Sequence, residues 1–193
     1  MSELKYLVLH CTATPEGKSY TSDDIRRMHM GPFTQPDGKI LWNGKTFSKK
    51  SELPDIMFYG KNLRQVSGRG WKQVGYSDII HPNGEVENLV PYDDDGIVQP
   101  REITNGALGL NGMSRHVSYI GGIDATGKPK DTRTARQMIS LDRYIKEMIR
   151  KHPDIKILGH NQVATKACPS FNVPFYLKSI GVDAKNIYMQ PSK

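Results

Sequence analysis

The chain has 193 residues, 37% of them hydrophobic, and Lys plus Arg exceed Asp plus Glu by 27 − 20 = 7. This length suits one domain with a sizeable core, and no apolar run approaches the roughly 20 residues of a membrane helix. Two cysteines exclude a disulfide scaffold, and a positive charge favours polyanionic partners without selecting one. The first residues, MSELKYLVLH, enter a strand-like run without a secretion signal. We therefore expect synthesis in the cytoplasm, and any export would use another route.

The first elements in chain order are a strand, a helix and a hairpin. Residues 5–10, KYLVLH, are apolar on both faces, which is typical of a strand inside a sheet covered on two sides. Residues 21–29 predict a helix capped by Thr21 or Ser22, with acidic residues in its first turn. The run KILWNGKTF predicts a small hairpin that turns at Asn43-Gly44.

Strands and helices continue to alternate after residue 70. Residues 75–87 predict a strand, a Pro-Asn-Gly turn and a second strand, and residues 115–124 predict a strand that ends in glycines. Residues 132–153 form the clearest helical pattern, followed by a short strand at 155–160 and a closing helix at 172–181. This alternation predicts an α/β fold with a central, mostly mixed sheet flanked by helices.

We expect a single domain over 1–193, present as a monomer, with an inserted loop-hairpin segment at 31–69. The segment is rich in Gly, Pro and Lys and carries several aromatic residues. Its role stays open from the sequence. It can form one wall of a substrate groove or hold an anionic glycan, or it can be a peripheral elaboration with its own small apolar cluster.

Two predicted strands end in histidine, at His10 and His160, and Cys168 follows the second of them by eight residues. Ligand sites of open α/β sheets gather at strand ends, and neighbouring strands lie only about 4.8 Å apart. Two neutral imidazoles and a thiolate suit zinc and leave a fourth position open. Ordinary packing of the three residues remains the alternative. Cys11 faces the opposite side from His10, so we expect it to pack in the core.

Four segments in order carry a family resemblance: VLHCTAT (8–14), GWKQVGYSDIIHPNGEVE (70–87), YIGGIDATGK (119–128) and GHNQVATKACPSF (159–171). With them the chain resembles the zinc-dependent N-acetylmuramoyl-L-alanine amidases of the type-2 family. That family includes phage lysozyme-type amidases and peptidoglycan recognition proteins. The likeness covers the chain except for about 31–69.

The resemblance implies the amidase fold and one zinc ion per chain, with His10, His160 and Cys168 as ligands. It also implies an active-site tyrosine at Tyr76 and a catalytic lysine at Lys166. The implied reaction is hydrolysis of the amide between N-acetylmuramic acid and L-alanine in bacterial peptidoglycan, the expected partner. Lys166 is the natural electrostatic partner of the oxyanion. Tyr76 can orient water, hydrogen-bond the oxyanion or relay a proton, and the sequence does not divide these roles.

The chain departs from the family pattern in the expected substrate groove. Gly106 or a neighbouring small residue stands where relatives often have a histidine, and the Asn-x-x-Ser-Ile-Gly pattern reads Asn-Gly-Met-Ser-Arg-His here. Arg115 can read a peptide carboxylate through two hydrogen bonds or can be a surface arginine. We interpret His116 as a strand residue rather than a fourth ligand. The YDDDG run (92–96) lacks the spacing of a calcium loop and predicts a solvated turn.

Three other classes of function stay open. A non-catalytic wall-recognition module can use the same scaffold, although an intact His-His-Cys set argues against it. A cysteine hydrolase can use Cys168 as its nucleophile, and it would lose activity on thiol alkylation without rescue by metal. Binding to nucleic acid or to a polymerase would draw on the positive charge. We find no stacking motif or helix-turn-helix, so we expect no nucleic-acid partner and no membrane insertion.

Overall fold

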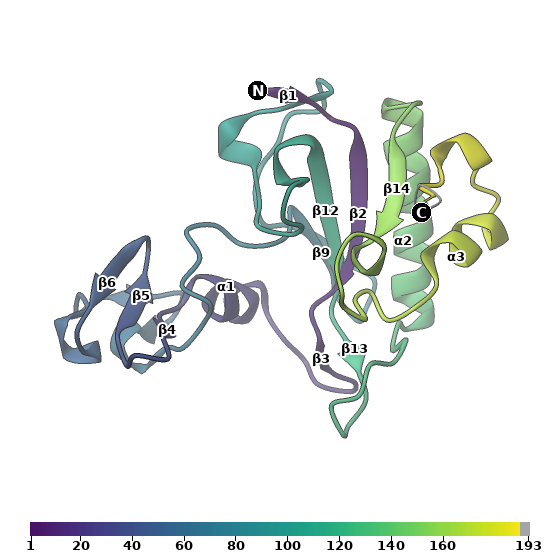
Figure 1. Cartoon of the computed structure of the whole chain (residues 1–193). Coiled ribbons are helices and arrows are strands. Elements are labelled where there is room, and N and C mark those ends of the chain that lie inside the picture. The colour runs from purple at the N-terminus through teal and green to yellow at the C-terminus, as the bar shows by residue number, and fades with distance from the viewer. Residues whose placement is uncertain (190–193) are drawn as a thin grey trace. The chain divides into compact units, whose positions relative to one another are not determined.

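The computed structural model describes residues 1–189, which fall into two compact units (Figure 1). The first unit combines Met1–Ser19 with the chain from Tyr76 onward, and the second is Tyr20–Gly75. The segment 31–69 lies within the second unit, together with the helix that precedes it. None of the helices in the described part of the chain is long and apolar enough to cross a membrane.

A mixed five-stranded sheet forms the centre of the first unit. Its order is β10 (Val86–Asn88), β9 (Asp78–Ile80), β12 (Ser114–Tyr119), β2 (Tyr6–Cys11) and β14 (Lys156–Gly159). Strands β9, β12, β2 and β14 run parallel, and β10 joins β9 as an antiparallel hairpin. The predicted mixed sheet and its strands are confirmed. Residues Leu7–Cys11 of β2 are buried on both faces of the sheet, which explains its apolar run.

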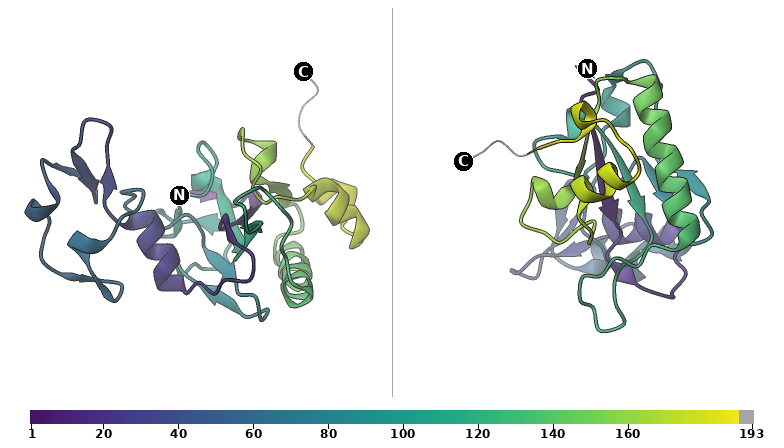
Figure 2. Two further views of the ribbon diagram at one scale, coloured as in Figure 1. Left: turned by 90° about the horizontal axis from the view of Figure 1, so that it is seen from below. Right: turned by 90° about the vertical axis from the view of Figure 1, so that its right-hand side faces the viewer.

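Two helices flank this sheet. Helix α2 (Ala135–Lys151) runs beside it (Figure 2) and buries Leu141, Ile145 and Met148 in the main core. Its first turn is closed by a capping box between Thr134 and Gln137. Helix α3 (Val173–Ser179) begins after Asn172, whose side chain accepts a hydrogen bond from the Phe175 N–H. Both helices were predicted from the sequence, at 132–153 and 172–181.

The remaining elements of the first unit are short. They are strands β1 (Ser2–Glu3), β3 (Thr14–Pro15), β11 (Ile97–Val98) and β13 (Gly122–Ile123), with 3₁₀ turns η3 (Pro100–Glu102), η4 (Asn111–Met113), η5 (His160–Gln162) and η6 (Ala184–Asn186). Strand β1 pairs with β11, and β13 pairs with β3. These pairs fix the loops at the two ends of the central sheet.

The second unit has a core of its own, made by Ile40, Leu53 and Leu63 with the rings of Trp42, Phe47 and Phe58 around it. It contains α1 (Ser22–Met30), the strands β4 (Phe33–Thr34), β5 (Ile40–Trp42), β6 (Lys45–Phe47), β7 (Met57–Phe58) and β8 (Lys61–Asn62), and the turns η1 (Lys50–Glu52) and η2 (Leu63–Gln65). Thr21 caps α1 in a capping box with Asp24. The β5–β6 turn has positive φ at Asn43 and Gly44 (47° and 73°), the pattern expected of a tight hairpin.

Candidate metal centre

His10 and His160 meet because their strands are parallel neighbours. Strand β14 pairs with β2 in a register that sets Gly159 opposite Leu9, so the next residue, His160, comes level with His10. The two imidazole rings lie 4.7 Å apart between centroids. Both side chains are buried, with 2% of His10 and 8% of His160 exposed. The carboxyl edge of the sheet therefore holds two histidines side by side.

The loop after β14 brings Cys168 back to these histidines. The chain makes the η5 turn, and the Asn161 N–H donates to the Cys168 carbonyl at 2.7 Å. The Tyr119 hydroxyl donates to the Pro169 carbonyl at 2.8 Å. A Cβ at Gly159 would lie 2.7 Å from Val173 Cγ2, so only glycine fits where the loop folds closely on itself.

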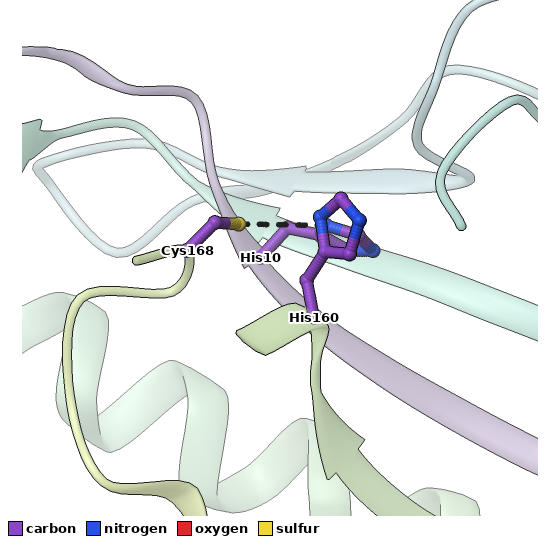
Figure 3. A group of neighbouring side chains, drawn as sticks. All are labelled: His10, His160 and Cys168. Atoms are coloured by element: carbon purple, nitrogen blue, oxygen red, sulfur yellow. Dashed lines mark hydrogen bonds between the residues drawn. The ribbon is translucent and has the colours of Figure 1, made fainter. Parts of the chain in front are cut away.

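Cys168 Sγ lies 3.6 Å from His10 Nδ1 (Figure 3). The ligand atoms of His10, His160 and Cys168 all lie within 4.8 Å of one another. Tetrahedral zinc with ordinary Zn–N and Zn–S bonds holds its ligand atoms about 3.4 to 3.6 Å apart. The sulfur-to-nitrogen distance already has this value, and two imidazoles with one thiol are a donor set that zinc accepts. The residues therefore fit a zinc ion.

The protonation state of His160 agrees with metal binding, whereas that of Cys168 depends on its neighbours. Burial, followed by the charge of Lys166, lowers the pKa of His160 to about 4, which leaves the imidazole neutral at pH 7. The hydrogen bond with the Cys11 thiol, followed by burial, raises the pKa of the Cys168 thiol. A divalent cation bound by the thiol would favour its thiolate form and oppose this shift.

Cys11 stands next to this group but belongs to the core. Its side chain is 3% exposed and packs with Leu7 and Leu9 on the same face of β2, as the alternation along the strand predicted. A Cβ at Gly122 would lie 2.3 Å from Cys11 Sγ, so glycine there makes room for the sulfur. Both cysteines are free thiols. The Cys11 backbone N–H also donates to Cys168 Sγ at 3.3 Å, which helps to hold that sulfur in place.

Tyr76 and Lys166 are both close to members of the donor group. The Tyr76 ring is 5.3 Å from the His10 ring between centroids, and its hydroxyl donates to the Cys11 carbonyl at 3.2 Å. Lys166 is an exposed residue of the 160–170 loop. Its positive charge lowers the pKa values of both His160 and Cys168, so its ammonium group is within electrostatic reach of the two ligand side chains. A phenol and an ammonium thus accompany the His-His-Cys group.

The profile of the N-acetylmuramoyl-L-alanine amidase family matches residues 1–171 of the sequence. The chain belongs to this family. The prediction of an amidase from the four sequence segments is thereby confirmed.

Phage endolysins are among the relatives of this amidase. The endolysin of Enterobacteria phage K11 is 36% identical over 111 residues, which are 58% of this chain and 68% of the relative. The endolysin of Escherichia phage T7 is 35% identical over 105 residues, or 54% of this chain and 64% of the relative. These alignments cover about two thirds of each endolysin.

Solved structures show the same fold. The endolysin amidase LysCS from Clostridium intestinale superposes with a TM-score of 0.57 at 19% identity, covering 94% of this chain and 86% of its own. Bumblebee PGRP-SA superposes with a TM-score of 0.58 at 16% identity, covering 99% and 87%. The fold predicted for the amidase is therefore confirmed.

Arg115 of the amidase lies away from the donor group, in the interior. Its side chain is 1% exposed, and its guanidinium donates to the buried Glu102 carboxylate at 2.9 Å. It also lies over the Tyr92 ring, 4.2 Å from the centroid. The guanidinium is thus enclosed by protein, with its Nη2 paired to a carboxylate. The placement gives Arg115 a structural role and does not support the predicted reading of a substrate carboxylate.

His116 occupies a place that the sequence did not reveal. It is a residue of β12, as predicted, and is fully buried. Its Nδ1 lies 3.0 Å from His10 Nε2, on the far side of the His10 ring from Cys168. Burial lowers the pKa of His116 to about 3, so the ring is neutral. The contact depends on the β12–β2 register, which pairs Ser118 with His10 and sets His116 two residues away on the same face.

Proposed function

We propose that this amidase hydrolyses the amide bond between N-acetylmuramic acid and L-alanine in bacterial peptidoglycan, with one zinc ion held by His10, His160 and Cys168. The convergence of these three donor atoms within 4.8 Å of one another carries the proposal. Family membership supports the bond that is cleaved, and the donor set supports the metal. Because all three ligands come from one chain, we propose that a monomer is active.

These three residues would hold a zinc ion with one coordination position left open, where the ion would lower the pKa of a water molecule and polarise a carbonyl. Cys168 contributes the negative ligand of the set, so the ligands and the ion together carry roughly one positive charge. His10 and His160 bind as neutral imidazoles. The low pKa of His160 keeps it in this form down to mildly acidic pH.

Tyr76 and Lys166 are the residues that we propose to act on the substrate. Lys166 is exposed on the loop that carries Cys168, so its ammonium can stabilise the negative charge that develops on the amide oxygen. The Tyr76 hydroxyl, held at the Cys11 carbonyl, lies beside His10. From there it can orient the attacking water or pass a proton towards the leaving amine.

The cell wall is the proposed place of action. The endolysins of phages K11 and T7 are relatives of the chain, and the net charge of +7 favours an anionic polymer such as the bacterial wall. We propose that the protein reaches the wall after release from the cell or by a dedicated export route. The proposed activity does not require a nucleic-acid partner.

Elemental analysis of the purified protein together with mass spectrometry of digested sacculi tests the proposal. We expect one zinc per chain, free lactyl groups on muramic acid and new N-terminal L-alanine. A protein that contains zinc and binds sacculi but releases no new N-terminal L-alanine would instead be a recognition module. A cysteine hydrolase would behave differently. Thiol alkylation would abolish its turnover, added zinc would not restore that turnover, and chelators would have no effect. The Cys168→Ser variant serves as the inactive control.

A further inference from the structure

The two ring nitrogens of His10 face two different partners. His10 Nδ1 lies 3.6 Å from Cys168 Sγ and belongs to the donor group, whereas His10 Nε2 lies 3.0 Å from His116 Nδ1. His116 comes from β12, the strand on the other side of β2 from β14, which carries His160. His10 therefore stands between the candidate metal site and a second, fully buried imidazole.

This arrangement constrains the proton on His10. A neutral imidazole has one N–H donor and one nitrogen with a free lone pair. If Nδ1 binds a metal ion, its lone pair must be free, so the proton sits on Nε2 and is donated to His116 Nδ1. His116 must then carry its own proton on Nε2. The opposite assignment, with His116 donating to His10, would place the His10 proton on Nδ1 and remove the ligand atom.

The backbone holds His116 in position for this contact. The Ser77 N–H donates to the His116 carbonyl at 2.8 Å, and the His116 N–H donates to Ser77 Oγ at 3.4 Å. In contrast, no residue of the described chain hydrogen-bonds His116 Nε2, although this nitrogen is buried. Burying an unpaired polar group is unfavourable. A side chain kept for packing alone would therefore be better replaced by an apolar one.

We propose that His116 is a positioning residue that holds His10 in the tautomer presenting Nδ1 to the metal. This inference rests on the proposed zinc site. Histidine ligands usually donate their second N–H to a carboxylate, a backbone carbonyl or water. Here a neutral imidazole takes the acceptor's place, which adds no charge next to the metal ligands. His116 itself is not one of the three grouped donors.

Two substitutions of His116 distinguish the loss of its hydrogen-bond acceptor from the loss of its volume. His116→Asn keeps an oxygen acceptor near the position of Nδ1, and His116→Leu fills similar space without an acceptor. Competition with a chromogenic chelator gives the zinc affinity of each variant. We expect His116→Leu to bind zinc about 10- to 100-fold more weakly than the unaltered protein, the usual cost of losing such a partner. We expect His116→Asn to stay within about threefold of it. Equal affinity in the Leu variant would overturn the inference.

Nitrogen-15 spectra of the histidine rings in the zinc-loaded, unaltered protein give a second readout that does not depend on how a variant folds. We expect His10 with a protonated Nε2 and a metal-bound Nδ1. A His10 bound through Nε2 would overturn the inference while leaving the zinc amidase intact. Absence of zinc binding by the unaltered protein would instead refute the proposed function.

Discussion

His10 Nδ1 lies 3.6 Å from Cys168 Sγ, although 158 positions separate the two residues. If this pair holds zinc, Cys168→Ser should remove most of the bound metal and nearly all turnover of sacculi, because a hydroxyl is a poor replacement for a thiolate ligand. Cys11→Ala is the matched control, since Cys11 is the other free thiol and is buried beside the group. We expect it to keep its zinc. Equal zinc content in Cys168→Ser, measured by elemental analysis, would contradict the assignment.

Zinc should stabilise the folded protein. The donor group forms only when β2, β14 and the loop are in place, so the ion binds the native state in preference to the unfolded chain. At a free concentration 100 times the dissociation constant, the gain is about 2.7 kcal/mol. Thermal unfolding with and without added zinc measures it, with magnesium as the control ion. A melting temperature that is the same in chelator and in zinc would speak against the site.

Tyr76→Phe and Lys166→Met should reduce turnover without releasing zinc. Loss of a proton-transfer group or an oxyanion partner costs roughly 100- to 1,000-fold in rate, and neither side chain belongs to the grouped donors. Release of muropeptides and zinc content are measured on the same samples. Lys178→Met is the control, because Lys178 is another exposed lysine, on α3. Near-normal turnover in Lys166→Met would remove that residue from the catalytic set.

The buried pair of Arg115 and Glu102 predicts a stability effect rather than a substrate effect. Glu102→Ala leaves the Arg115 guanidinium in the interior without its 2.9 Å partner. Breaking such a pair costs about 3 to 5 kcal/mol of unfolding free energy. The double variant Arg115→Met, Glu102→Leu should lose clearly less unfolding free energy than the two single variants lose together. If Arg115→Met instead raises KM with unchanged urea stability, Arg115 contacts substrate after all.

The second unit should lose stability in mild acid through His29. Its Nδ1 accepts a hydrogen bond from the Gly75 N–H at 3.1 Å, which a protonated ring cannot do. Burial, followed by the charge of Arg69, lowers the pKa of His29 from 6.5 to about 4. The unfolded chain therefore takes up this proton first as the pH falls. The contribution of His29 to the unfolding free energy is therefore present above pH 6.5 and is lost as the pH falls towards 4. By pH 5 the loss is about 2 kcal/mol.

Tryptophan fluorescence isolates this effect, because both tryptophans, Trp42 and Trp71, lie in Tyr20–Gly75. We expect the urea midpoint to fall between pH 7.5 and pH 5. The drop should be smaller in His29→Asn, which keeps an acceptor but has no titrating ring. An equal drop in both proteins would assign the pH dependence to other groups.

The sequence by itself determined the features that depend on neighbouring residues. The cap at Thr21, one of the two candidates in the sequence, and the turn at Asn43-Gly44 are local hydrogen bonds and local backbone preferences, and the structure has both. The two-sided apolar run of β2 also identified an interior strand. The ordered family segments led to the amidase fold and to the three donor residues.

Only the tertiary structure decided which distant side chains meet. The order of the central sheet places β12 beside β2, and the register of that pairing brings His116 to His10. The same strand turns Arg115 inward to Glu102, whereas its position in the sequence was equally compatible with the surface. The second compact unit begins at Tyr20, ahead of the segment at 31–69, since the α1 helix belongs with it. Pairings between strands far apart in the chain depend on the whole core, and single-residue patterns do not encode them.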